Sequence, residues 1–104
     1  MWAQLITMRL KPGKDEGLAT LIDQVRAGER PGAGVVHTSV MRDQNDPSRV
    51  LVLVMYESEE KARERERDPA FQEQMQADNA AMAEIFDGAP EFVDLTVVAE
   101  WSGL

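Results

Sequence analysis

The sequence predicts one α+β domain over residues 1–104, built as a four-stranded antiparallel sheet with its helices on one face. Two observations indicate this fold class. Segments with strand-like composition alternate with segments of helical spacing, in the order β-α-β-β-α-β. One stretch, Val50–Met55, is apolar at every position, so both faces of that strand need cover. The content of 43% hydrophobic and 29% charged residues is that of a globular protein.

The first strand and the first helix are separated by a clear break. The strand is expected over Trp2–Leu10, where apolar and polar residues mix and the run stops at Pro12-Gly13. A helix follows from Lys14, because large aliphatic residues recur there at i, i+3, i+4 and i+7. These residues are Leu18, Leu21, Ile22 and Val25. Gly28 ends the helix, whose single apolar stripe is expected to pack on the sheet.

The next two strands predict a hairpin and a free sheet face. They are expected over Val35–Arg42 and Arg49–Glu57, separated by turn-forming residues, and should pair antiparallel. Right-handed crossovers would place both helices on the same side of the sheet. The other face of Val50–Met55 then lacks cover from this chain. We therefore expect a second copy of the chain to bind that face.

The second helix is expected in two pieces, followed by the last strand. Ser58 is a good N-cap for the first piece, and Asp68 should break the helix because it precedes a proline. Gly88 and Pro90 are expected to end the second piece, and Glu91–Trp101 to form the last strand. The apolar stripe of the second piece consists of Phe71, Met75, Met82, Ile85 and Phe86. The complete order is that of a ferredoxin-like fold.

The composition argues against several classes of partner and site. The net charge is −8 at pH 7, so we expect no binding to nucleic acid or to an anionic membrane. The chain contains no cysteine, which excludes disulfides and thiolate metal sites and fits a reducing, cytoplasmic location. The N-terminus shows no basic stretch before an apolar run, so no signal peptide is expected. One histidine with scattered carboxylates predicts no metal site.

Three short motifs add a family resemblance to this order of elements. They are the turn Lys11-Pro12-Gly13-Lys14, the segment Tyr56-Glu57-Ser58-Glu59-Glu60, and Asp68-Pro69-Ala70-Phe71. With them the chain resembles, over nearly its whole length, the antibiotic biosynthesis monooxygenase (ABM) domain of the dimeric α+β barrel superfamily. The resemblance implies a homodimer whose two sheets face each other as a barrel, with a pocket in each subunit between sheet and helices.

The activity implied by this resemblance is that of a cofactor-independent monooxygenase, which oxidises a small aromatic, phenolic or quinol-type substrate with molecular oxygen. Many relatives carry Trp in place of Tyr56, and quinol-type relatives often carry His in place of Arg65. These departures leave open a second function, that of a non-catalytic small-ligand-binding or stress-associated homodimer. Haem degradation is disfavoured, because Thr7, Tyr56 and Gln74 replace the Asn, Trp and His of that branch.

The candidate catalytic residues are His37, Tyr56 and Thr7. His37 is the only histidine, and it is either a general base for a phenolic proton or a structural residue of the dimer interface, which we favour. Tyr56 ends the third strand, where it either holds a substrate oxygen or caps the core. Thr7 joins the set through its place in the family resemblance.

Five residues of the long second helix are expected to line the substrate pocket. They are Phe71, Gln74, Met75, Asp78 and Met82. The aromatic and methionine side chains suit a flat apolar ligand, and core packing is the alternative that we favour for most of them. Asp78 either faces inward or forms the polar edge of the apolar stripe, which we favour. The alternating charges of Arg63–Arg67 predict a solvated helical face.

Overall fold

The sheet of the computed structural model, which describes residues 1–103, has four antiparallel strands in the order β2-β3-β1-β4. The strands are β1 (Trp2–Leu10), β2 (Val35–Arg42), β3 (Arg49–Tyr56) and β4 (Phe86–Thr96). β1 lies inside the sheet and pairs with both β3 and β4. β2 pairs with β3 as the predicted hairpin. The predicted four-stranded antiparallel sheet is therefore confirmed.

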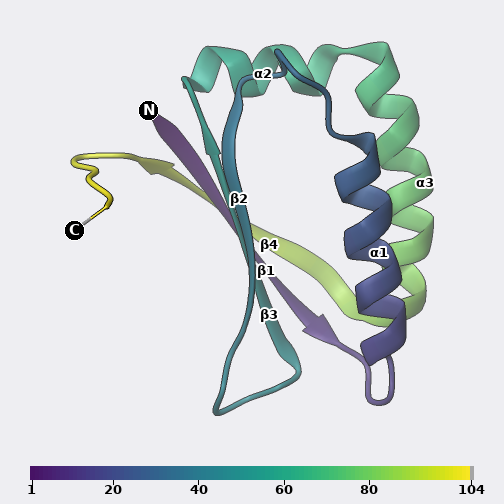
Figure 1. Ribbon diagram of the computed structural model, residues 1–104. Helices are drawn as coiled ribbons and strands as arrows, with labels where there is room; N and C mark the ends of the chain where they lie inside the picture. The colour runs from purple at the N-terminus through teal and green to yellow at the C-terminus, as the bar shows by residue number, and fades with distance from the viewer. Residues whose placement is uncertain (104) are drawn as a thin grey trace.

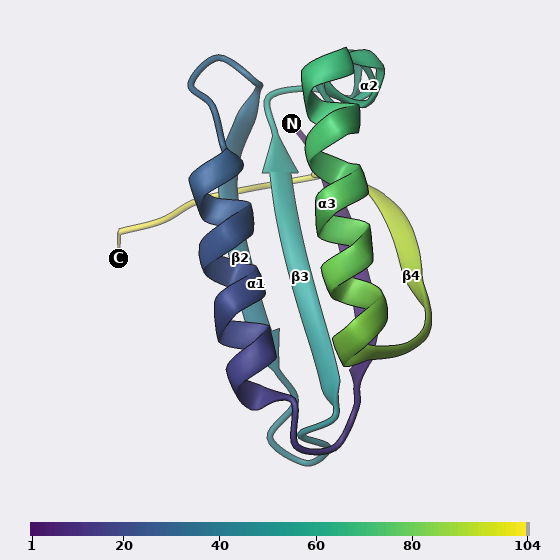
Figure 2. The same ribbon diagram turned by 90° about the vertical axis from the view of Figure 1, so that its right-hand side faces the viewer.

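The helices all lie on one side of this sheet (Figure 1). They are α1 (Asp15–Gly28), α2 (Glu59–Arg67) and α3 (Pro69–Ile85). α1 and α3 run side by side along the direction of β2 and β3, and α2 lies at one end of the layer (Figure 2). The Ser58 hydroxyl accepts a hydrogen bond from the Lys61 amide and caps α2. The Asp68 carboxylate accepts one from the Ala70 amide, and its backbone is extended, so the helix breaks there as predicted.

The last strand differs from the sequence-based expectation at both ends. The strand β4 spans Phe86–Thr96 rather than Glu91–Trp101, and α3 ends at Ile85. Gly88 and Pro90 lie inside the strand, where the register with β1 shifts. Such a shift marks a β-bulge, which accommodates the positive φ of +71° at Gly88 and the missing amide hydrogen of Pro90. The two residues are therefore part of a bulge, and the prediction that they end a helix is wrong.

The core consists of two apolar clusters on the helix-covered face of the sheet. The larger joins three strands to α1 and α3, and its buried members are Met8, Leu10, Leu21, Val50, Ile85 and Phe86. The smaller lies between the sheet and α2, and its buried members are Trp2, Val54, Tyr56 and Ala62. The two long helices approach closely at Gly17, where a Cβ atom would lie 2.7 Å from Cγ2 of Ile85. Gly17 therefore permits the helix contact that seals the larger cluster.

The opposite face of the sheet carries no helix (Figure 1). Leu5 of β1 pairs with Leu53 of β3 and with Val93 of β4, so these three side chains share that face. By the same alternation it also carries Ala3, Leu51, Met55 and Leu95. Val93 is 47% exposed. The residues of this set form an apolar surface, which we call the open face.

Candidate functional site

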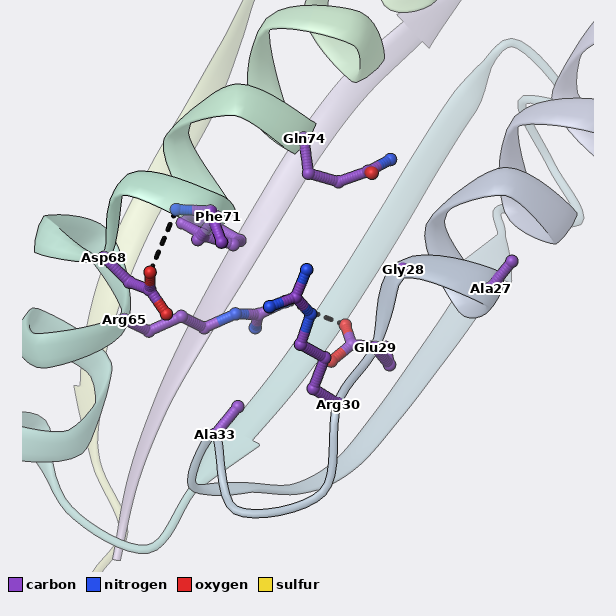
Figure 3. A pocket seen from close by; sticks show the side chains of 10 residues that line it. Ala27, Gly28, Glu29, Arg30, Ala33, Arg65, Asp68, Phe71 and Gln74 are labelled. Carbon is purple, nitrogen blue, oxygen red and sulfur yellow. Dashed lines mark hydrogen bonds and ion pairs between the residues drawn. The ribbon is translucent and has the colours of Figure 1, made fainter.

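A pocket of about 210 Å³ lies between the end of α1 and the junction of α2 with α3 (Figure 3). Its polar and aromatic lining comes from both helical segments and includes Glu29, Arg30, Arg65, Asp68, Phe71 and Gln74. A cavity of about 150 Å³ accommodates benzene, and pockets for larger ligands usually exceed about 300 Å³. The size of this pocket therefore suits a ligand with a single aromatic ring.

Arg65 is the central charged group of the pocket. Its guanidinium donates hydrogen bonds to the Tyr56 hydroxyl at 3.1 Å and to a Glu29 carboxylate oxygen at 2.9 Å. The guanidinium carbon lies 4.4 Å from the centre of the Phe71 ring, a cation–π distance. The side chain of Arg65 is only 15% exposed. Arg65 is thus a largely buried cation held beside an aromatic ring. Figure 3 shows its side chain reaching from α2 toward Glu29.

Gln74 connects the pocket to a buried carboxylate. Its side-chain amide donates to Oδ1 of Asp78 at 3.2 Å, and the amide of Gln24 donates to the same oxygen at 2.8 Å. Asp78 is 4% exposed, and among residues 1–103 it is the only charged residue that is buried. The carbonyl oxygen of Gln74 accepts no hydrogen bond from residues 1–103 and can therefore accept one from a ligand. A Cβ at Gly28 would lie 3.2 Å from the Gln74 side chain, so Gly28 leaves it room.

Two of the sequence-predicted catalytic residues lie on the other side of the sheet. His37 is exposed, and it pairs with Met55 in the register of the open face. Its Nε2 lies 2.6 Å from the Ser39 hydroxyl. Thr7 pairs with Leu51, so it also belongs to the open face. Within one subunit, His37 and Thr7 are therefore separated by the sheet from Tyr56, which is buried under α2.

The predicted pocket residues of α3 divide into two groups. Phe71 and Gln74 line the pocket. Met82 packs against the larger core cluster, and Met75 is half-buried outside the lining. Asp78 faces inward with two amide donors, so the favoured expectation that it forms a polar helix edge is wrong. Its burial is tolerated because both glutamines donate to it.

Arg65 is the pocket residue that the sequence analysis missed, because it was grouped with a solvated helical face. That expectation is wrong for Arg65, which is largely buried. The available signal was its position three residues after Ala62, which is 2% exposed, since residues three apart share a side of a helix. The alternating charges concealed this signal, because residue type alone does not distinguish Arg65 from Arg63 and Arg67.

A separate cluster of charges links α2 to the edge of the sheet. The Arg63 guanidinium lies 5.1 Å from the centre of the Trp2 ring and donates to the Asp94 carboxylate at 3.0 Å. A hydrogen bond from the Gln4 amide, followed by the one from Arg63, holds the pKa of Asp94 below its usual value. The Asp94 hydrogen bond in turn raises the pKa of Arg63. These contacts lie outside the pocket and stabilise the position of β4.

Two features that would indicate other kinds of site are absent from the described part of the chain. Among residues 1–103, no group of three or more His, Asp or Glu residues could hold a metal ion. In the same range, no helix has the length and apolar character needed to cross a membrane. The pocket beside Arg65 is therefore the strongest candidate site in residues 1–103.

The sequence profile of one protein family, described as antibiotic biosynthesis monooxygenase, matches residues 1–77. This range runs from β1 into α3 and includes Arg65, Phe71 and Gln74. It confirms the resemblance that the three sequence motifs indicate. A comparison with curated proteins finds no match.

Solved structures resemble the chain over almost its whole length. A Nitrosomonas europaea protein assigned to the same family has a TM-score of 0.75 at 13% identity, covering 95% of this chain and 100% of its own. A Mycobacterium tuberculosis protein has a TM-score of 0.72 at 16% identity, with 97% and 98% covered. SnoaB, a cofactor-independent oxygenase from Streptomyces nogalater, has a TM-score of 0.71 at 12% identity, with 95% and 94% covered. At these identities the likeness establishes the ferredoxin-like α+β fold.

Proposed function

The chain belongs to the antibiotic biosynthesis monooxygenase family, and from that premise we propose that it is a cofactor-independent monooxygenase acting on a small phenolic or quinol-type substrate. The observation that carries the proposal is the largely buried Arg65 guanidinium beside the Phe71 ring, in a pocket sized for one aromatic ring. A structural neighbour named as a cofactor-independent oxygenase supports the same class of reaction.

The chemistry of a quinol makes an external reductant unnecessary. One quinol and one O₂ give one hydroxyquinone and one water, so the substrate itself supplies the electrons that reduce the second oxygen atom. Loss of a proton from a ring hydroxyl to solvent water increases the electron density of the ring and eases electron transfer to O₂. A nearby cation favours that ionised form.

Three side chains of the pocket have roles in this proposal. Arg65 stabilises the ring oxygen as it becomes negative, because a largely buried, preorganised cation is an effective electrostatic catalyst. Phe71 contacts the substrate ring edge-to-face, because the Arg65 guanidinium lies over the Phe71 ring. The carbonyl oxygen of Gln74, fixed by the hydrogen bond from its amide to Asp78, accepts a hydrogen bond from a second substrate hydroxyl. Tyr56 positions Arg65 through its hydroxyl.

The proposed assembly is a homodimer in which the open faces of two subunits meet. The support is the apolar open face, whose central residues include Leu5, Leu53 and Val93 and which no helix covers (Figure 1). His37 and Thr7 would then lie in the subunit interface. We therefore assign His37 the structural role in place of that of the general base.

A non-catalytic ligand-binding homodimer is the competing function. The observation that favours it is the separation of His37 and Thr7 from the pocket by the sheet. On that reading the pocket would bind a small aromatic ligand and return it unchanged. Both functions share the pocket and differ in whether oxygen is consumed.

Incubation with a panel of hydroquinones and polyphenols tests the proposal. The purified protein is incubated in air and under argon, and ¹⁸O₂ is supplied in a third series. We expect oxygen-dependent formation of a product that carries one labelled oxygen atom, with the other atom recovered in water. A protein lacking any oxygen-dependent turnover across the panel, while still binding panel members, would support the ligand-binding function.

A further inference from the structure

Glu29 lines the pocket and holds its carboxylate against the Arg65 guanidinium. Its carboxylate accepts from Arg65 at 2.9 Å, and within residues 1–103 this is its only side-chain hydrogen bond. Arg65 itself is additionally held by the Tyr56 hydroxyl and stacked on the Phe71 ring. The cation is therefore fixed by several contacts, whereas its carboxylate partner is held by one.

The position of Glu29 allows its side chain to leave without unfolding the helix. Glu29 follows the last residue of α1, and its amide donates to the Arg26 carbonyl oxygen at 3.2 Å. This bond fixes the backbone, so only side-chain rotation is needed to release Arg65. The Glu29 side chain is 32% exposed and can rotate into water. The ion pair consists of one hydrogen-bonded contact, so a ligand anion that makes the same contact with Arg65 can replace the Glu29 carboxylate.

The remaining charges of the pocket favour an anion once Glu29 leaves. Arg30 also lines the pocket, and in the described residues it makes no ion pair. The other carboxylate of the lining, Asp68, already accepts from the Ala70 amide as the cap of α3. Without Glu29, two guanidinium groups would face one carboxylate that is bound elsewhere. The local charge is then positive, in a chain whose net charge is −8.

From these contacts we propose that the pocket binds a single-ring aromatic oxyanion, a carboxylate or a phenolate, and that Glu29 is an intramolecular competitor for its anion subsite. The ring lies against Phe71, and the oxyanion replaces the Glu29 carboxylate on Arg65. This inference rests on the pocket of the proposed function and names its ligand class. It does not require that the ligand be oxidised.

Binding under argon tests the inference separately from turnover. Isothermal titration calorimetry at pH 6, where carboxylates are ionised and phenols are not, compares 4-hydroxybenzoate with 4-hydroxybenzamide, which has nearly the same shape but no charge at that pH, and with acetate, which has no ring. We expect 4-hydroxybenzoate to bind about tenfold more tightly than the amide, because a hydrogen bond to a charged acceptor is stronger than one to a neutral acceptor. We expect acetate to bind more weakly than both. Equal affinities for 4-hydroxybenzoate and 4-hydroxybenzamide, or for 4-hydroxybenzoate and acetate, would overturn the inference.

Two variants examine the role of Glu29. Glu29→Gln removes the competing charge and should tighten 4-hydroxybenzoate binding by about threefold, leaving 4-hydroxybenzamide unchanged. Glu84→Gln makes the same change in net charge on the exposed end of α3 and serves as the matched control. A Glu29→Gln variant that binds benzoate no better than Glu84→Gln would refute the competition.

The results also separate this inference from the proposed function. Quinol oxidation without any preference for the aromatic anion would leave the monooxygenase proposal standing and remove the anion subsite. A preference for 4-hydroxybenzoate that Glu29→Gln strengthens, in a protein without oxygen uptake, would establish the subsite in a non-catalytic binder.

Discussion

The two faces of the sheet are formed by the same strands and are both apolar, but only one of them is covered by helices. On the covered face, alternate residues of β1 and β3 such as Met8 and Val50 are buried under α1 and α3. On the open face, their neighbours Leu5 and Leu53 are equally apolar but have no helix above them. The comparison shows that the chain builds one covering layer for a sheet that is apolar on both sides. We propose that a second copy of the chain covers the open face.

The two faces also differ in the burial of their candidate functional side chains. On the covered face, Arg65 and Asp78 are largely buried, and each has specific hydrogen-bond partners. On the open face, His37 is exposed, and among residues 1–103 its side chain has one hydrogen-bond partner, the Ser39 hydroxyl. Burial strengthens electrostatic interactions, so the covered face is the better place for chemistry on a substrate.

The largest expected effect comes from breaking the proposed cover of the open face. Leu53→Arg places a charge at the centre of that face in each subunit, where a dimer would bury it without a partner. Burying an unpaired charge costs several kcal/mol, so we expect dimerisation to weaken by more than about a hundredfold. Sedimentation velocity over a concentration series measures the change.

The control for this variant is Ala80→Arg, which adds the same charge to an exposed position of α3 and should leave the dimer intact. A Leu53→Arg protein that remains dimeric at nanomolar concentration would show that the open face is not the interface. A wild-type protein that is monomeric at micromolar concentration would show the same.

A smaller effect is expected from the buried carboxylate of the covered face. Asp78→Ala would leave the amides of Gln24 and Gln74 without their acceptor, at a cost of about 1–3 kcal/mol in the free energy of unfolding. Asp78→Asn keeps an oxygen of the same size at that place and should cost clearly less. Urea unfolding measures both. If Asp78→Ala were as stable as the wild type, the hydrogen bonds to Asp78 would contribute nothing to folding.

The smallest effect is expected at the exposed ion pair between Arg63 of α2 and Asp94 of β4. The pKa of Asp94 is lowered in the folded protein, so its contribution to stability is present above its ordinary value of 3.8 and is lost as the pH falls through the lowered pKa. Asp94→Asn should therefore be less stable than the wild type near pH 6 and approach it in acid below that value. The urea midpoint measured from pH 6 to pH 2.5 checks this prediction. A stability difference that does not shrink in acid would contradict it.

The element types could be read from the sequence because local rules decide them. Ser58 and Asp68 fix the starts of α2 and α3 through their caps, and both were identified from residue type alone. The bounds of β4 were missed because Gly88 and Pro90 suit a helix end and a β-bulge equally well. Only pairing with β1 distinguishes the two structures, and pairing is not a local property.

The candidate site was less predictable, because it depends on which side of a strand or helix each residue faces in the folded chain. Phe71 was found from the helical spacing, and Gln74 from its place in the family resemblance; both line the pocket. His37 was singled out for its chemistry, and a strand sequence does not reveal which face it will take. Arg65 was hidden in a run of alternating charges, and its burial depends on the contact with Glu29 from a distant segment.

Oxygen uptake by two variants tests most directly whether catalysis takes place on the covered face. With a quinol that the wild type oxidises, kcat/KM is measured for Arg65→Gln and for His37→Ala, with Arg67→Gln as the control on the exposed side of α2. We predict a loss of about a hundredfold or more for Arg65→Gln, as for the removal of an oxyanion-stabilising donor, and near wild-type values for the other two. A variant pattern in which His37→Ala loses activity and Arg65→Gln retains it would contradict this account.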